Sequence, residues 1–252
     1  MESSQNTKIY FISDFHLGVP NEVESRKREK RIVDWLELVR KDAAEIYLLG
    51  DVFDFWFEYK HVVPKGFVRL LGKLAELSDQ GIKLHYFTGN HDMWAFDYLP
   101  SEIGVELYRE PVRREIFGKT FLIGHGDGLG PGDHGYKFIK SVFANRFCQW
   151  LFQWIHPNIG VGIANYFSRR SRIATGNTED QYLGDEKERL VQYCLDKLQK
   201  DKIDYFVFGH RHLPIEKELP GGAVYFNIGD WIRYDTYLVT SQDQVMMIEH
   251  KE

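Results

Sequence analysis

Five short segments of the chain each end an apolar run in aspartate, asparagine or histidine. They read SDFHLG (13–18), LLGDVFD (48–54), TGNHD (88–92), IGHGD (123–127) and FGHRH (208–212). Carboxylates, an amide and imidazoles at the ends of strands are a ligand set for divalent metal ions. Each segment alone fits an ordinary polar turn equally well. Because loops at the carboxyl ends of strands open into one crevice in α/β sheets, the five together predict a centre with two metal ions.

Two divalent ions roughly 3.5 to 4 Å apart need a bridging carboxylate, and they must keep positions open for a hydroxide and a substrate. Asp51 is the predicted bridge, and Gly50 before it allows a close backbone turn. The histidines make the site nitrogen-rich, which favours Mn²⁺, Fe or Zn²⁺ over Mg²⁺. Asp54, Asp92 and Asp127 are predicted to be turn carboxylates, or outer carboxylates that orient the ligating histidines, rather than metal ligands.

The elements that must position these residues follow from apolar patterning. Strand-like runs rich in aromatic and branched residues occur at 8–13, 45–50, 83–89, 120–126, 204–210 and 223–229. Helical spacing is found at 21–42, 65–79 and 184–200. Alternating strands and helices indicate βαβ units, and the closely spaced strands of the last fifty residues indicate antiparallel pairs. We expect an α/β fold, a mixed two-sheet β-sandwich flanked by helices, in one domain over 1–252 with an inserted helical cap at 131–180.

Composition narrows the class of protein. The chain has 252 residues, a net charge of -5 and two cysteines, Cys148 and Cys194, without metal-ligand spacing. The amino terminus carries no apolar run typical of a secretory signal, so a cytoplasmic location is expected. The acidic balance argues against a nucleic-acid partner. Residues 142–167 are apolar but too interrupted to span a membrane.

The five segments together resemble those of the calcineurin-like metallophosphoesterases, and their spread covers most of the chain. The resemblance implies attack on phosphorus by a hydroxide that bridges two divalent ions. It implies that His91 acts on the phosphate or the leaving group, as an electrophile or general acid. One ion would be held by Asp14, His16, Asp51 and His212, and the other by Asp51, Asn90, His125 and His210.

Three further stretches, GDVFDFWF, GHGDGLGPGDHGYKF and RRSR, are similar to the UDP-2,3-diacylglucosamine pyrophosphohydrolases of lipid A biosynthesis. That resemblance implies cleavage at the α-phosphate to give UMP and 2,3-diacylglucosamine 1-phosphate, with Mn²⁺ as the metal and a cap that takes two acyl chains. It implies peripheral attachment at the inner face of the cytoplasmic membrane and no protein partner. The implied substrate contacts are Asn90, His91, Asp133, Arg170, Ser171, Arg172 and His210.

Some positions depart from that subfamily. It usually reads GNRD, whereas this chain reads GNHD, so His91 stands in place of an arginine. Thr175 and Thr178 stand where basic residues are expected, and the arginines around Ser171 are the candidates to supply that charge. GHRH replaces the commoner GHTH and keeps both histidines.

The predicted cap has an unusual number of large apolar side chains. Phe143, Phe147, Trp150, Leu151 and Trp154 recur at helical spacing. We expect most of them to be buried between the cap helices and the main domain. The remaining apolar surface would hold acyl chains or rest on a bilayer.

Other functions stay open at this stage. A metallophosphoesterase acting on another nucleotide phosphodiester or a soluble phosphate ester is favoured by GNHD. A binding module that has lost its chemistry is disfavoured, because every predicted ligand is present. A nuclease would need a basic groove, which the composition does not favour.

Overall fold

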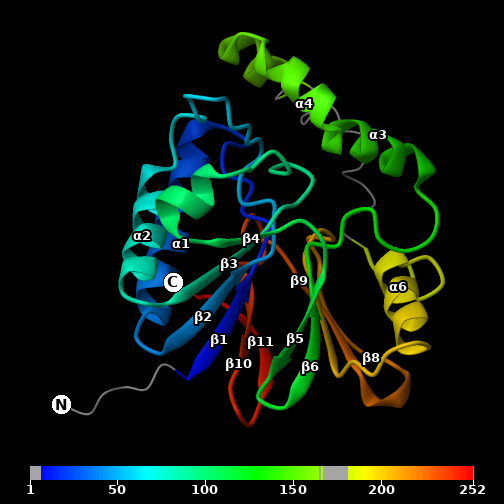
Figure 1. Ribbon diagram of the computed structural model, residues 1–252. Helices are drawn as coiled ribbons and strands as arrows, with labels where there is room; N and C mark the ends of the chain where they lie inside the picture. The colour runs from blue at the N-terminus through cyan, green and yellow to red at the C-terminus, as the bar shows by residue number, and fades with distance from the viewer. Residues whose placement is uncertain (1–6, 165, 167–180, 252) are drawn as a thin grey trace.

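The computed structural model describes residues 7–164, 166 and 181–251, and it contains two sheets packed against each other (Figure 1). The six-stranded sheet has the order β11-β10-β1-β2-β3-β4, and the five-stranded sheet has the order β5-β6-β7-β9-β8. The first is built from β1 (Lys8–Ile12), β2 (Ala43–Leu48), β3 (Lys83–Phe87), β4 (Glu106–Tyr108), β10 (Thr236–Thr240) and β11 (Val245–Glu249). The second is built from β5 (Val112–Ile116), β6 (Lys119–Ile123), β7 (Tyr205–Phe208), β8 (Pro214–Glu218) and β9 (Val224–Ile228).

Both sheets are mixed. In the first, β1 to β4 are parallel and β10 joins β1 antiparallel; in the second, β6, β7 and β9 are parallel and are flanked by antiparallel β5 and β8. Phe11 and Tyr47 of the first sheet pack with Phe121 and Phe226 of the second in one buried cluster. The predicted two-sheet sandwich is therefore confirmed.

Helices cover the outer faces of the sandwich (Figure 1). α1 (Glu22–Val39) and α2 (Val68–Asp79) bury Trp35 and Leu74 against the first sheet, and α6 (Arg189–Leu198) buries Cys194 against the second. The chain also has two short helical turns, the π-helical η1 (Leu99–Ile103) and the 3-10 turn η2 (Pro220–Gly222).

The helix predictions are right in place and less exact at the ends. α1 begins after Asn21, whose side chain accepts hydrogen bonds from the N–H groups of Val23 and Glu24, each at 3.0 Å. The helix predicted from 184 begins only at Arg189, because Gly184 has a φ of 88° and Glu188 is extended. Neither conformation continues a helix.

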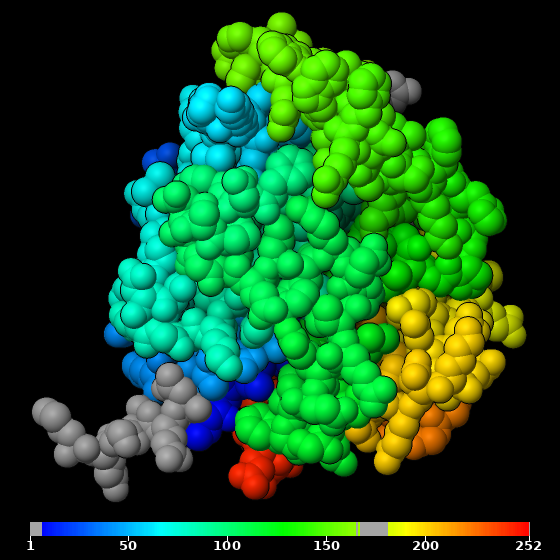
Figure 2. Space-filling model, viewed as in Figure 1, coloured from blue at the N-terminus to red at the C-terminus, as the bar shows by residue number. Residues whose placement is uncertain are grey.

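The region predicted as a cap holds α3 (His134–Ala144) and α4 (Arg146–Gln153), which cross the top of the molecule (Figure 2). The expectation that most of their apolar side chains are buried is wrong, since no residue of either helix is buried. The helices contact the main domain through Phe143 and Phe152, which pack against Trp94. Within the described part of the chain, every helix is too short or too polar to cross a bilayer.

Candidate metal centre

All seven predicted ligands lie at the carboxyl ends of strands, where the two sheets meet. Asp14 and His16 follow β1, Asp51 follows β2, Asn90 follows β3, His125 follows β6, and His210 and His212 follow β7. Parallel strands carry their carboxyl ends to one edge, so residues nearly two hundred positions apart come together.

One group contains Asp14, His16, Asp51 and His212, whose ligand atoms lie within 4.8 Å of one another. The Nε2 atoms of His16 and His212 are 3.1 Å apart, and Asp14 Oδ1 lies 3.6 and 3.4 Å from them. Asp51 Oδ2 is 3.6 Å from His16 Nε2.

A second group contains Asp51, His125 and His210. The Nε2 atom of His125 lies 3.4 Å from Asp51 Oδ2 and 3.3 Å from the Oδ1 atom of Asn90. Asp51 thus belongs to both groups, and the same oxygen faces an imidazole of each. This is the position that a bridging carboxylate requires.

The cluster fits divalent cations, and Asp14 gives the clearest sign. Its Oδ2 atom accepts hydrogen bonds from Ser13 Oγ at 2.5 Å and from the N–H of His210 at 3.0 Å. Its Oδ1 atom is buried and accepts none, although two imidazole nitrogens lie 3.4 and 3.6 Å away. A buried carboxylate oxygen is costly without a donor or a cation, so a metal ion would satisfy it.

Electrostatics within the cluster agree with that fit. Burial would raise the pKa of Asp51, but His125 and His91 hold that pKa well below its ordinary value, so Asp51 is ionised. Burial opposes a charge on His125, but Asp51 raises the His125 pKa to about 10. Burial lowers the pKa of His210 to about 3, which keeps it in the neutral form that binds metals. In this cluster a proton on His125 balances the negative charge of Asp51. Bound divalent ions would balance that charge instead, and His125 could then bind metal in its neutral form.

The second ring nitrogen of three histidines is held by another residue. His125 Nδ1 donates to the carbonyl of Leu49 at 2.7 Å, His212 Nδ1 lies 3.1 Å from Asp230 Oδ2, and His16 Nδ1 lies 3.5 Å from Asp54 Oδ1. These contacts aim each Nε2 atom at the centre. The prediction that Asp54 orients a histidine agrees with this contact. Sequence reasoning missed Asp230, whose only signal is a strand that ends in NIGD.

Asp92 and Asp127 belong to none of the groups of possible ligands, as predicted, but their hydrogen bonds go to partners other than the histidines. Asp92 accepts from the N–H groups of Gly89 and Val52 at 2.7 and 2.9 Å, so it ties two metal-bearing loops together rather than a histidine. Asp127 accepts from Tyr136 Oη at 2.6 Å and pairs with Lys140 Nζ at 2.8 Å. Tyr136 and Lys140 belong to α3, so Asp127 anchors that helix beside the centre.

The backbone around the centre is strained. Asp14, His16, Asp51, His210 and His212 all have φ between 44° and 70°, a left-handed conformation that costs a residue other than glycine about 1–3 kcal/mol. At Gly50 a Cβ atom would lie 2.7 Å from the nitrogen of Gly89 and from the ring of His125. The predicted close turn at Gly50 is confirmed.

His91 lies beside the centre and faces the solvent-accessible side. Its Nδ1 atom donates to the carbonyl of Asp54 at 2.9 Å, and its ring lies edge-on to that of His16, with centroids 4.8 Å apart. Its side chain is partly exposed, at 16%. The bond at Nδ1 fixes the ring, so Nε2 is the atom that can address a substrate.

The other predicted substrate contacts are not all brought together. Asn90 and His210 lie in the cluster, whereas Asp133 caps α3 and pairs with Arg189. Arg170, Ser171 and Arg172 lie outside the described residues.

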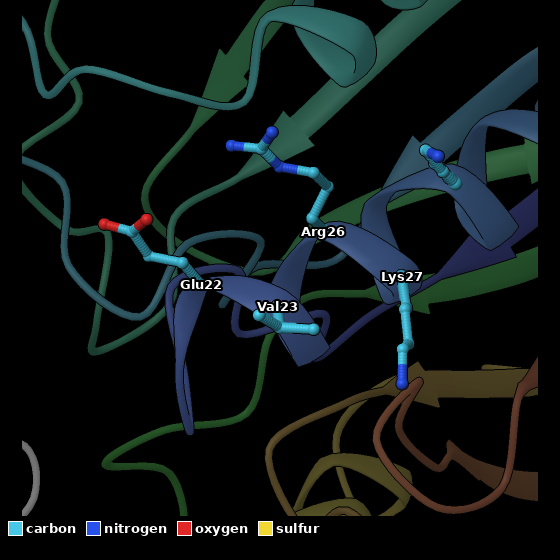
Figure 3. Close-up of a pocket in the computed structure, with 5 residues that line it drawn as sticks. Glu22, Val23, Arg26 and Lys27 are labelled. Atoms are coloured by element: carbon cyan, nitrogen blue, oxygen red, sulfur yellow. The ribbon is translucent and has the colours of Figure 1, made fainter.

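A solvent-open hollow of about 360 Å³ on the first turns of α1 is unrelated to this chemistry (Figure 3). Its lining residues are Glu22, Val23, Arg26, Lys27 and Lys30. Arg26 and Lys27 extend from opposite sides of the helix, so the hollow does not gather these charges into a site.

The model of the calcineurin-like phosphoesterases matches residues 7–214, a range that includes every residue of the cluster. The chain belongs to the calcineurin-like phosphoesterase family. Membership brings metal-dependent hydrolysis of phosphate esters, and it implies divalent metal ions, for which the structure offers clustered ligand residues.

Curated relatives within this phosphoesterase family extend over nearly the whole chain. A UDP-2,3-diacylglucosamine hydrolase from Porphyromonas gingivalis is 39% identical over 245 residues, which cover 92% of this chain and 94% of that protein. A protein of the same name from Actinobacillus succinogenes is 26% identical and covers 94% and 97% of the two chains. Among solved structures, the phosphoesterase Yfce from E. coli matches with a TM-score of 0.48 and 15% identity, over 96% of this chain and 92% of that one.

Proposed function

We propose that this protein hydrolyses the pyrophosphate of UDP-2,3-diacylglucosamine to UMP and 2,3-diacylglucosamine 1-phosphate, a step of lipid A biosynthesis. The observation that carries the proposal is the match at 39% identity to a hydrolase named for that substrate, over nearly the full length of both chains. The ligand cluster supplies the chemistry that such a reaction needs.

The arrangement of the ligand residues supports the following roles. Asp14, His16, Asp51 and His212 would hold one ion, and Asp51, Asn90, His125 and His210 the other. When bound, the two ions activate water and neutralise charge on the phosphoryl oxygens, and Mn²⁺ is our choice of ion with Fe or Zn²⁺ as alternatives. Asp54 and Asp230 orient His16 and His212, and the N–H of His91 donates to Asp51 Oδ1 at 2.8 Å. Asp51 therefore keeps its Oδ2 atom toward both groups.

The alternative is a metallophosphoesterase acting on another nucleotide phosphodiester or a soluble phosphate ester. His91 favours it, because this residue stands where the lipid A enzymes usually have arginine. The two functions share the metal ligands, so they differ only in what the protein binds beyond the phosphate.

Product analysis separates them. We expect purified protein with Mn²⁺ to release UMP from detergent-dispersed UDP-2,3-diacylglucosamine much faster than it hydrolyses bis-p-nitrophenyl phosphate. Uridine diphosphate N-acetylglucosamine, which has no acyl chains, is the matched control. Turnover of the generic diester without UMP release would discard the lipid substrate and keep the two-metal chemistry.

We further propose that residues 131–180 form a cap that receives acyl chains and rests on the inner surface of the cytoplasmic membrane. The underside of α3 and α4 packs on aromatic residues of the metal-bearing loops: Phe152 lies 5.0 Å from Trp94 and 4.7 Å from Phe57, between ring centroids. The outer side carries Phe138, Phe147 and Trp154, which are 69%, 64% and 76% exposed. Exposed aromatic side chains of this size mark an interaction surface.

The charge of this segment supports a lipid surface as the partner of the exposed face of α3 and α4. Residues 134–178 contain no aspartate or glutamate, although the whole chain has a net charge of -5. The basic residues of this segment are Lys137, Lys140, Arg146, Arg169, Arg170 and Arg172. A segment that combines exposed tryptophan and phenylalanine with only positive charge is matched to the anionic lipids of a cytoplasmic leaflet.

Binding to lipid vesicles tests whether the outer side of α3 and α4 faces the membrane. Replacing Trp150 and Trp154 by serine is expected to weaken binding to phosphatidylglycerol vesicles by at least about tenfold, since each buried aromatic contributes roughly 1.5–3 kcal/mol. Leu38→Ser is the control, because Leu38 is 51% exposed near the far end of α1, where the helix has run back to the amino-terminal edge of the sheet. Equal binding of all variants, or binding that ignores lipid charge, would contradict the proposed face.

A further inference from the structure

Arg211 stands between the two ligands His210 and His212, but its side chain forms a buried ion pair away from the cluster. Its Nε and one terminal nitrogen donate to the two oxygens of Glu188, each at 3.0 Å. Glu188 is 2% exposed. The planar fork of arginine matches a carboxylate in this two-pronged geometry, which fixes orientation as well as distance.

The same pair reaches the chain that returns after residue 180. A terminal nitrogen of Arg211 donates to the carbonyl of Gln181 at 3.1 Å, and Glu188 Oε1 accepts from the N–H of Leu183 at 3.0 Å. Glu188 directly precedes α6, so the ion pair connects the loop of His210 and His212 to the start of that helix. Leu190, in the first turn of α6, packs beside Gly126 of the loop that carries His125.

The loop that carries His210 and His212 needs such a support. Both histidines adopt the left-handed conformation, with φ of 70° and 55°. The N–H of His210 is held by Asp14 Oδ2, and the His212 ring is held by Asp230. Arg211 lies between these two anchored residues in the sequence, and its ion pair with Glu188 ties the intervening residue to the segment before α6. Residues with strained backbones keep their conformation only when the surroundings determine it.

We propose that Glu188 and Arg211 are positioning residues that hold His210 and His212 in the conformation that binds metal. Neither residue belongs to the groups of predicted ligands, and the pair acts on both groups at once because each group takes one histidine from this loop. The proposal rests on the metal ligands assigned under the proposed function, but not on the identity of the substrate.

A purely structural ion pair would also affect folding, so metal affinity must be compared with stability. We would measure the affinity for Mn²⁺, without substrate, by competition with a chelating dye, and the midpoint of thermal unfolding in EDTA. The variants are Arg211→Met, Arg211→Lys and Glu188→Gln. Lys217→Met is the matched control, because Lys217 forms a 2.9 Å ion pair with Asp185, close to α6 but away from the ligand loop.

Arg211→Met and Glu188→Gln are expected to weaken Mn²⁺ binding by roughly 10–100-fold, the usual effect of losing an outer partner of a ligand. Arg211→Lys keeps the charge but loses the fork, so it should fall between Arg211→Met and the unmodified protein. If Arg211→Met does not fold, the affinity of Arg211→Lys for Mn²⁺ decides the test. Lys217→Met should keep full affinity. Mn²⁺ binding by the Arg211 and Glu188 variants that equals that of Lys217→Met would overturn the proposal.

His212→Ala separates this proposal from the ligand assignment beneath it. If His212→Ala loses Mn²⁺ while Arg211→Met and Arg211→Lys keep it, only the positioning role is wrong. If His212→Ala itself keeps both ions, the assigned ligands are wrong, and the proposed function loses its metal centre with them.

Discussion

Replacement of Asp51 by alanine is expected to abolish turnover and to release both metal ions. Its Oδ2 atom is the one oxygen that faces an imidazole of each group, at 3.6 Å from His16 and 3.4 Å from His125. Without it the remaining ligands lose their shared negative charge, and two cations would repel each other with no carboxylate between them. The effect should exceed the roughly 10–100-fold loss caused by removing an outer partner.

Asp230→Asn is the matched comparison for Asp51→Ala. Asp230 is also a buried carboxylate, but it contacts the centre only through His212. Elemental analysis and turnover of bis-p-nitrophenyl phosphate should show near-complete loss for Asp51→Ala and a partial loss for Asp230→Asn. Circular dichroism checks that both variants fold. Two bound ions and retained turnover in Asp51→Ala would refute the site.

The elements of this fold that can be predicted from the sequence are those whose own residues form a recognisable pattern. The strands at the centre of each sheet are buried on both faces, so they read as continuous apolar runs such as KIYFI and YFVF. β5 and β8 read VRREI and PIEKE and were not predicted, because they are edge strands with one exposed face. Alternation of polar and apolar residues over five positions is also found in loops.

The residues of the site also fall into a group with local sequence signals and a group without them. Each predicted ligand follows a strand in its own short motif, so the ligand set can be read without knowing the fold. The partners that orient these ligands have no such motif: Asp230 is 18 positions from His212, and Glu188 is 23 positions from Arg211. Helical spacing in 143–154 identifies an apolar face, but only packing decides whether that face is covered. Burial was therefore overestimated there.

His91→Ala is expected to lower the catalytic rate by about 10²–10⁴-fold, the usual range for a positioned acid or electrophile, while the metal content stays unchanged. The side chain of His91 lies beside His16 and forms a group with His16 and Asp54, but it belongs to neither of the two ligand sets predicted for the metal ions. Its backbone N–H, which donates to Asp51, is kept in the variant. A metal-poor variant with an unaffected rate per bound ion would contradict this role.

The choice between acid and electrophile can be decided with His91→Arg. In a pyrophosphate the leaving group is itself a phosphate, whose second pKa is near 6, so it departs without a proton. A cation that neutralises the phosphoryl oxygens is then enough, and arginine supplies one permanently. We therefore expect His91→Arg to retain most UMP release from UDP-2,3-diacylglucosamine and to lose activity on diesters with alkoxide leaving groups, which need a proton. Equal loss on both substrates would contradict the electrophile role, because arginine keeps a positive charge at this position.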